Sequence, residues 1–223
     1  MTRVIFDIET VGEDFEKLDE ISQEYMLRYS ETDEDKEVVR QSLGFYPLTG
    51  EIVAIGMLNP DTGKGVVYFQ TAGEKLEKIV EENVEFIPGT EAEIIKHFWQ
   101  AIKKYDQFIT FNGRTFDCPY IMIRSAIHKI KPTRNLMPYR YDPKEHIDLL
   151  DLLTFYGAVR KRFGLHMWCR AFGIKSPKEE GITGDNVKEL FKQKKFLEIA
   201  RYCLGDLQAT KELYFYWEKY IKV

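Results

Sequence analysis

The feature that most constrains the fold is a set of polar residues placed far apart in the chain. Asp7 and Glu9 end the apolar run at 4–6, and on a strand residues two apart point to one face of a sheet. Tyr202 and Asp206 are four residues apart, a spacing that stacks the phenol one helical turn from the carboxylate. A strand and a helix that share one site predict a mixed α and β domain.

A third segment, FNGRTFDCPY, supplies Asp117 where a short apolar strand over 108–111 leads into a helix. Catalytic residues at strand ends are typical of open α/β sheets. Each pattern is weak alone, because an aspartate at a helix start is often only a cap. Together the acidic residues predict a site for two Mg²⁺ or Mn²⁺ ions, which prefer carboxylate oxygens. The expected metal ligands are Asp7, Glu9, Asp117 and Asp206.

The order and wording of these segments resemble the three motifs of the DEDD superfamily of 3′-to-5′ exonucleases, which has the RNase H-like fold. The motifs read D-x-E, N-x-x-x-x-D and Y-x-x-x-D, and the last one marks the tyrosine (DEDDy) branch. The histidine branch has a histidine where this chain has Arg201. The segments PLTGEIVAIGM and GIKSPKEEGITG look most like stand-alone predicted exonucleases similar to the proofreading domain of family B DNA polymerases. The resemblance runs from about Arg3 to Tyr216.

This resemblance implies a single exonuclease domain over residues 1–223, with a mixed five-stranded α/β sheet flanked by helices. Residues 13–43 are its least typical part, and we interpret them as an acidic helical insertion. Such an insertion would act as a lid, bind a protein partner, mediate self-association or be only a decorated loop.

The resemblance also implies a role for each catalytic residue. Asp7 would bridge two ions, and Asp117 would reach one of them, directly or through water. Glu9 and Asp206 would complete the ligands of the other ion. Tyr202 would orient the attacking water first and act as a general base second, since an unperturbed phenol pKa of about 10 disfavours proton acceptance.

Candidate substrate contacts lie next to these motifs, and they are Thr10, Val11, Asn112, Phe116 and Lys175. The backbone amides of the first two would hold a terminal nucleotide, and the next two would bind or stack on a base or sugar. A phenylalanine in such a pattern, as at Phe116, is more often a core residue than a substrate contact. Lys175 and the GITG loop at 181–184 would meet phosphates. Asp148 and Asp151 remain either supporting carboxylates of the site or ordinary helix caps and surface groups.

Composition places the chain among water-soluble globular proteins, with 44% hydrophobic and 30% charged residues over 223 positions. The start MTRVIFDIET enters a predicted strand directly, so we expect no cleavable signal, no membrane span and a cytoplasmic location. The three cysteines, Cys118, Cys169 and Cys203, have no metal-type spacing and are interpreted as packing residues.

Charge is unevenly distributed, although the net value is −4. Residues 13–37 hold 11 acidic and 3 basic residues, a local charge of −8, whereas residues 124–178 hold 12 basic and 4 acidic residues, a local charge of +8. The basic stretch is a candidate surface for nucleic-acid phosphates, or alternatively a solvated face.

Periodicity predicts the elements around the motifs. Strands are expected over 3–8, 51–58 and 65–70, the last two as a hairpin. Apolar residues from Phe15 to Leu27 predict one amphipathic helix. Further helices are expected over 31–42, 90–105, 117–127, 164–172, 186–194 and 196–220. Thr90 and Glu93 are arranged as a capping box at the start of the second of these. A short strand or helix start is expected over 146–153, and a long loop over 128–145.

Three functions are compatible with these patterns. The first is a metal-dependent 3′-to-5′ exonuclease that acts on single-stranded DNA or frayed ends by a two-metal-ion mechanism. An RNase D-like exoribonuclease would use the same residues on RNA. A non-catalytic nucleic-acid-binding or docking module would keep the fold without the chemistry, and an endonuclease or resolvase would not be expected to have the tyrosine spacing.

Overall fold

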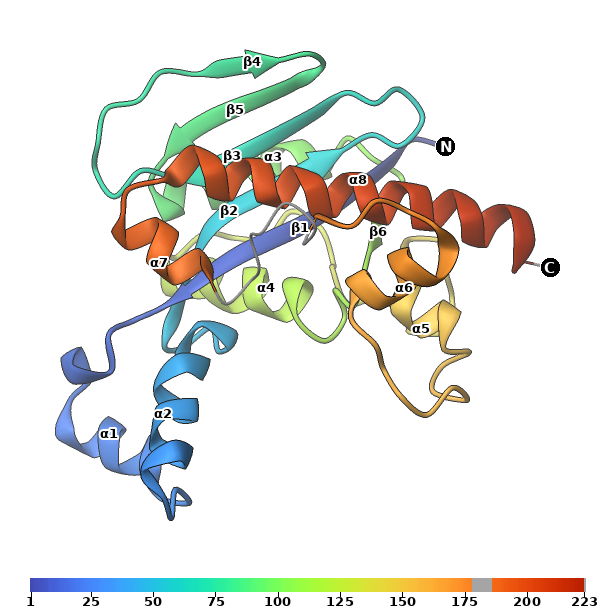
Figure 1. The fold of residues 1–223 in the computed structure, drawn as a ribbon. Helices are drawn as coiled ribbons and strands as arrows, with labels where there is room; N and C mark the ends of the chain where they lie inside the picture. Colours follow the sequence, from blue (N-terminus) through green and yellow to red (C-terminus); the bar gives the residue numbers. More distant parts are fainter. Residues whose placement is uncertain (178–185, 223) are drawn as a thin grey trace.

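A mixed sheet of seven strands forms the centre of the molecule in the computed structural model, which describes residues 1–177 and 186–222 (Figure 1). Across the sheet the strands follow the order β4-β5-β3-β2-β1-β6-β7. The strands are β1 (Arg3–Gly12), β2 (Gly50–Leu58), β3 (Gly65–Gln70), β4 (Ile79–Glu81), β5 (Val84–Gly89), β6 (Gln107–Thr110) and β7 (His146–Asp148).

β1 is paired over different lengths on its two edges. It runs antiparallel to β2 from Ile5 to Gly12, but parallel to β6 only from Arg3 to Ile5. The second edge of β1 therefore continues past the end of β6. Asp7 and Glu9 lie on this extended part of the strand, where other elements can approach them.

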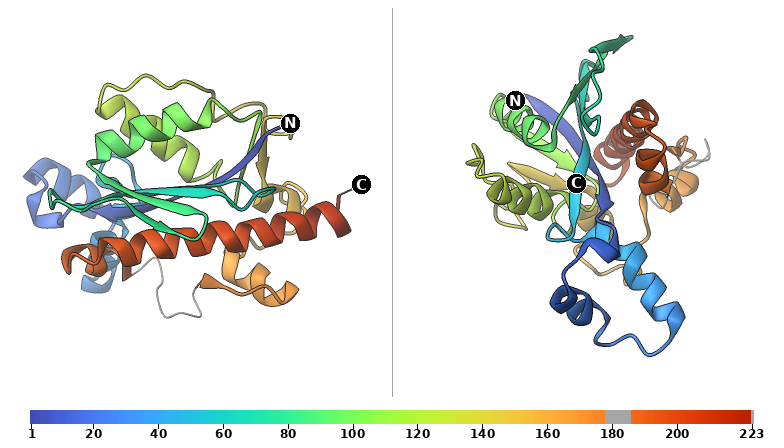
Figure 2. Two further views of the ribbon diagram at one scale, coloured as in Figure 1. Left: turned by 90° about the horizontal axis from the view of Figure 1, so that it is seen from above. Right: turned by 90° about the vertical axis from the view of Figure 1, so that its left-hand side faces the viewer.

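Helices cover both faces of the sheet (Figure 2). On one face, Val4, Phe6 and Ile8 of β1 belong to a core that includes α3 and α4. On the other face, α8 crosses the sheet and packs together with α6 and α7. The helices are α1 (Glu20–Leu27), α2 (Asp33–Ser42), α3 (Glu91–Ile102), α4 (Asp117–Ile127), α5 (Leu149–Leu153), α6 (Leu165–Phe172), α7 (Val187–Lys192) and α8 (Phe196–Tyr220), with short 3₁₀ turns η1 (Phe15–Lys17) and η2 (Leu43–Phe45).

Several local predictions are confirmed. β2 and β3 form the expected antiparallel hairpin, and the Thr90 hydroxyl and Glu93 carboxylate form both halves of the capping box at α3. α4 begins at Asp117, and the segment over 146–153 contains both a strand, β7, and a helix, α5. All three cysteines are buried, as packing residues should be, and none forms a disulfide bond among the described residues.

The expected number of five strands is wrong, because the sheet has seven. β4 has only three residues and forms an antiparallel hairpin with β5, whereas the other edge of β5 pairs in parallel with β3. Val84 and Phe86 of β5 are buried, whereas Glu85 between them points outward. A strand that depends on a partner about 20 residues earlier leaves a weak local signal.

The single helix expected from Phe15 to Leu27 is also wrong. The structure has η1 and then α1, and neither α1 nor α2 contains a buried residue. The insertion projects from the sheet (Figures 1 and 2). Only its base is anchored, through buried Phe15 and Leu43 and a close approach of Gly12 to Gly44, where an added Cβ on Gly12 would lie 2.5 Å from the Gly44 nitrogen.

Within the described residues, none of the helices is both long and apolar enough to cross a lipid bilayer.

Candidate active site

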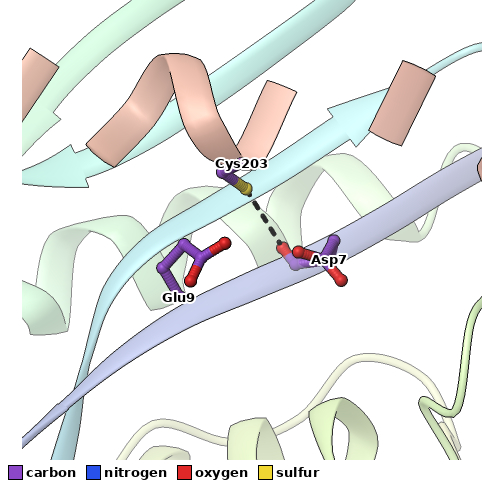
Figure 3. Close-up of side chains that lie close together, drawn as sticks. All are labelled: Asp7, Glu9 and Cys203. Carbon is purple, nitrogen blue, oxygen red and sulfur yellow. Dashed lines mark hydrogen bonds between the residues drawn. The ribbon is translucent and has the colours of Figure 1, made fainter. Parts of the chain in front are cut away.

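Asp7 and Glu9 lie on the face of β1 that is covered by α8. Their carboxylate oxygens and the sulfur of Cys203, on α8, are all within 4.8 Å of one another (Figure 3). Asp7 is half-buried and Glu9 is buried. The pairing with β2 shifts register between Glu9 and Thr10, which indicates a β-bulge immediately after the acidic pair. Bulges occur next to active sites because they change the direction of neighbouring side chains.

Cys203 supports this arrangement through a contact with the backbone of β1. Its Sγ donates a weak hydrogen bond to the Asp7 carbonyl oxygen, 3.8 Å away (Figure 3). Burial, followed by the charges of Asp7, Glu9 and Asp206, raises the pKa of this thiol well above its usual value. The thiol therefore stays protonated, and only the thiolate is an effective ligand.

Gly56 on β2 allows α8 to approach the sheet at this point. A Cβ on Gly56 would lie 2.6 Å from Cδ1 of Leu207 and 2.8 Å from Sγ of Cys203. Any larger residue would push α8, and with it Tyr202 and Asp206, away from β1. This role of Gly56 was not predicted, and its only sequence signal is a glycine within the apolar strand EIVAIGML.

Asp117 reaches the same place from the opposite side of the β1 edge. It is the first residue of α4, and its Oδ1 accepts a hydrogen bond of 3.1 Å from the backbone N–H of Ile8. Burial raises the pKa of Asp117 to about 7, and the charges of Asp148 and Asp206 act in the same direction, whereas backbone hydrogen bonds oppose the rise.

The carboxylates of Asp7, Asp117 and Asp206 influence one another. Burial raises the pKa of Asp7 well above its usual value, and the charges of Asp117, Asp206 and Glu9 raise it further. Three segments remote in the sequence thus place four acidic groups within electrostatic reach. Mutual repulsion of this kind is relieved when divalent cations bind between the carboxylates.

Tyr202 is buried beside this group. Burial raises its pKa above the ordinary phenol value, and the charges of Asp206, Glu9 and Asp7 and a hydrogen bond to Asp206 have the same effect. The phenol is therefore a hydrogen-bond donor near neutral pH. The residue one position earlier, Arg201, points elsewhere and pairs with Glu81 at 2.5 Å.

Asp148 is a helix cap that also organises the loop before Asp117. Its carboxylate accepts hydrogen bonds from the backbone N–H groups of Leu150 and Asp151 in α5. It also accepts from the N–H groups of Asn112, at 3.0 Å, and Arg114, at 2.9 Å. The cap interpretation fits Asp148, and the loop contacts add a positioning role. Asp151 forms an ion pair with Arg140 at 2.5 Å.

The residues expected to contact substrate have different surroundings. The Thr10 hydroxyl donates to the Gly44 carbonyl at 2.8 Å. Asn112 is half-buried with a left-handed φ of 65°, and Phe116 is half-buried against the core near Phe45 and Tyr120.

Lys175 is exposed, and the chain two residues later touches α8 beside Asp206, since a Cβ on Gly205 would lie 3.0 Å from Cβ of Pro177. The GITG loop at 181–184 lies outside the described residues.

A cavity of about 500 Å³ continues from the end of β1. Val11 contributes to its wall, together with Lys188, Phe191 and Lys192 of α7. Both lysines pair with Asp14, at 3.3 and 3.1 Å, and their hydrogen bonds lower the pKa of Asp14 to about 2. The cavity lies two residues beyond Glu9 along the same strand, so it adjoins the acidic cluster.

The chain is similar in sequence to known proteins. Residues 51–222 match the model of a family described as a predicted 3′-5′ exonuclease related to the exonuclease domain of PolB. The chain is 36% identical over 80 residues to a DNA polymerase of Methanocaldococcus jannaschii, covering 30% of this chain and 5% of that protein.

The fold is also similar to that of the family B DNA polymerase of the hyperthermophilic archaeon Pyrobaculum calidifontis, with a TM-score of 0.61 and 17% identity. The similarity covers 97% of this chain and 24% of the polymerase, so the chain corresponds to a small part of each polymerase. This likeness confirms the expected RNase H-like α/β fold. The chain belongs to the family of predicted 3′-5′ exonucleases related to the exonuclease domain of PolB.

Proposed function

We propose that this protein is a divalent-metal-dependent 3′-to-5′ exonuclease that hydrolyses single-stranded DNA or frayed DNA ends. The observation that supports this most directly is the convergence of Asp7, Asp117 and Asp206, since the charges of Asp117 and Asp206 raise the pKa of buried Asp7 and the charge of Asp206 raises the pKa of buried Asp117. Family membership supports the reaction class, and similarity to DNA polymerases favours DNA over RNA.

The donor set fits Mg²⁺ or Mn²⁺. The available ligands are hard carboxylate oxygens, whereas the adjacent Cys203 is a neutral thiol, a combination that disfavours zinc. Asp7 would contact two ions, with Glu9 and Asp206 on one and Asp117 on the other. When bound, such a pair supplies a water of lowered pKa and charge stabilisation for the leaving 3′ oxygen.

The protein groups would position the reactants around that centre. Tyr202, with its raised pKa, would donate a hydrogen bond that orients the attacking water. The backbone near Thr10 and Val11 would hold the terminal nucleotide, because Val11 borders the cavity that continues from Glu9. Asn112 and Phe116, in the loop before Asp117, would flank the sugar or base, and exposed Lys175 would approach a phosphate.

The test compares oligonucleotides labelled at the 3′ end, labelled at the 5′ end, or circular, each as DNA and RNA, with Mg²⁺, Mn²⁺ or EDTA. We expect mononucleotide release from the 3′ label first, a shortening ladder from the 5′ label and no attack on circles. Cleavage of circular DNA would indicate an endonuclease. Hydrolysis restricted to RNA would support the exoribonuclease alternative, and no hydrolysis of any polymer would support a binding module.

A further inference from the structure

Three tyrosines from two separate segments form a cluster on the surface. The rings of Tyr139 and Tyr141 are 5.7 Å apart in an edge-on arrangement, and Tyr141 is 4.8 Å from Tyr156. Tyr139 is 73% exposed and Tyr141 57% exposed. We call these three residues the tyrosine platform. Clustered aromatic rings that remain exposed indicate a binding surface more often than isolated ones do.

Positive charge surrounds the tyrosine platform. Residues 157–162, which we call the basic loop, are all exposed and contain Arg160, Lys161 and Arg162 but no acidic residue. Arg140 lies between two of the tyrosines and pairs with Asp151, which also lies 3.7 Å from Arg162. Two further carboxylates lie nearby: Asp142 accepts the backbone N–H of Lys144, and the charge of Asp148 acts on Arg140. The four cations therefore outnumber the three carboxylates of Asp142, Asp148 and Asp151.

The backbone holds this surface in an unusual conformation. Phe155, Tyr156 and Gly157 have consecutive left-handed φ values of 49°, 56° and 99°. For bulky residues such a conformation is strained, and strained residues of this kind cluster at functional sites. The N–H of Tyr156 donates to the Asp151 carbonyl at 2.6 Å, which fixes the position of this tyrosine.

The tyrosine platform and the basic loop are attached to the loop that carries Asp117. Arg162 Nη2 donates to Asn112 Oδ1 at 2.9 Å. Arg114 Nη1 donates to the carbonyl of Pro138, at 2.8 Å, next to Tyr139. Both contacted residues, Asn112 and Arg114, lie within five positions of Asp117 and are bound by Asp148.

We propose that the tyrosine platform and the basic loop bind the 5′ part of a single-stranded DNA substrate whose 3′ end lies at the acidic cluster. This inference rests on the proposed exonuclease function. Because such an enzyme releases the 3′-terminal nucleotide, the strand that remains lies on the 5′ side. Tyrosine rings stack on bases with little sequence preference, and lysines and arginines contact the phosphates. Of the basic stretch at 124–178, this surface is the part with exposed aromatic rings among cations.

The test separates DNA binding from hydrolysis. Binding of a 5′-labelled oligo(dT) of about 20 nucleotides, longer than most single-strand sites, is measured by fluorescence anisotropy in EDTA. We expect Tyr139→Ala with Tyr141→Ala to weaken binding about tenfold or more. Arg160→Ala with Lys161→Ala should reduce the magnitude of the slope of log K against log salt by about 1 to 1.5.

The matched control is the pair Tyr25→Ala, on α1, and Tyr29→Ala, in the turn just after this helix. These rings are 60% and 81% exposed, and Arg28 lies 4.3 and 4.6 Å from their centroids. This second tyrosine and arginine cluster lies in the acidic insertion and should not change DNA affinity. Unchanged melting temperatures would show that all variants fold.

Hydrolysis of a dinucleotide, whose one phosphodiester bond must lie at the acidic cluster, should be unaffected by the tyrosine platform variants. Wild-type affinity of these variants for the long strand would overturn the inference. A change in sedimentation with DNA affinity preserved would also overturn it, and would assign the surface to protein contacts. If wild-type protein hydrolyses nothing yet binds DNA through these tyrosines, the exonuclease proposal fails while the binding site stands.

Discussion

Asp7 is the residue at which burial and the charges of Asp117, Asp206 and Glu9 act together. An amide at this position cannot serve as an anionic ligand for two cations. We expect Asp7→Asn to lower kcat on 3′-labelled single-stranded DNA at least about 100-fold, with the circular dichroism spectrum unchanged. Asp33→Asn, at an exposed position of α2, is the matched control and should leave kcat within twofold, about the scatter of such measurements.

The same substitution should stabilise the metal-free protein. The pKa of Asp7 is raised on folding, so its carboxylate lowers stability once the pH exceeds the unfolded value of about 3.9. Near neutral pH, Asp7→Asn should therefore raise the melting temperature in EDTA. It should also diminish the stabilisation that Mn²⁺ gives the wild-type protein. A lower melting temperature in EDTA would contradict this account.

Asp117 should make metal affinity depend on pH. Its pKa is raised to about 7, and a carboxylate must lose its proton before it binds a cation. As the pH falls below about 7, the Mn²⁺ concentration that gives half-maximal thermal stabilisation should rise by up to about tenfold per pH unit for each displaced proton. Asp117→Asn should flatten this dependence. A half-maximal concentration that does not change with pH in the wild type would exclude the effect.

At the scale of elements, Glu91 joins α3 to α4 and to β2. Its buried carboxylate accepts hydrogen bonds from Arg124 at 2.8 and 2.6 Å and from the backbone N–H of Ile52 at 2.8 Å. The Oε2 atom of Glu91 also lies 2.6 Å from Nε2 of His128. We expect Glu91→Gln to lower the free energy of unfolding in urea by about 2–4 kcal/mol, because Arg124 loses its charged partner.

The pH dependence gives the sign of this contribution. Burial raises the pKa of Glu91, but the hydrogen bonds from Arg124, Ile52 and His128 outweigh it and the net pKa is lowered. The stabilisation is therefore present above the unfolded value of about 4.3 and is lost as the pH falls through the folded value. The difference in the free energy of unfolding between the wild type and Glu91→Gln should therefore become smaller in that acidic range.

The control for this element is Glu85, which forms an exposed ion pair with Lys78 at 2.7 Å on β5. Glu85→Gln should cost less than about 1 kcal/mol, since water and ions screen surface pairs. If Glu91→Gln and Glu85→Gln lower the free energy of unfolding equally, the buried hydrogen bonds of Glu91 do not hold α3, α4 and β2 together.

For the whole molecule, we expect the segment at 13–43 to be separable from the core. α1 and α2 contain no buried residue, whereas Phe15 and Leu43 anchor the base, and Arg40 lies 5.2 Å from the Phe15 ring. Replacing 19–40 with a short Gly-Ser linker should shift the free energy of unfolding by no more than about 1–2 kcal/mol.

The shortened protein should retain hydrolysis of short substrates. Analytical ultracentrifugation of both proteins tests the proposed role in self-association, because a wild-type dimer that becomes a monomer on shortening would assign the contact to α1 and α2. Loss of the cooperative unfolding transition would show that the insertion belongs to the core.

Sequence alone predicted the features set by local spacing. The D-x-E pair needs only a strand, Tyr202 and Asp206 need only one helical turn, and Thr90 with Glu93 needs only a helix start. The prediction that these groups lie close together came from the resemblance to a family, because spacing along the chain cannot bring residues 7 and 206 together. β4 was missed because three residues are too few to show a periodic pattern, and the parallel pairing of β5 was missed because it depends on β3, a distant partner.

Tertiary structure decided which distant groups share a surface. Gly56 faces Cys203 and Leu207, so one glycine in β2 sets the approach of α8 to the acidic pair on β1. Tyr139, Tyr141 and Tyr156 form one cluster only because two loops close on each other beside the loop that carries Asp117. Local chemistry is encoded by neighbours along the chain, whereas register, close packing and charge clusters arise when folding brings remote segments into contact.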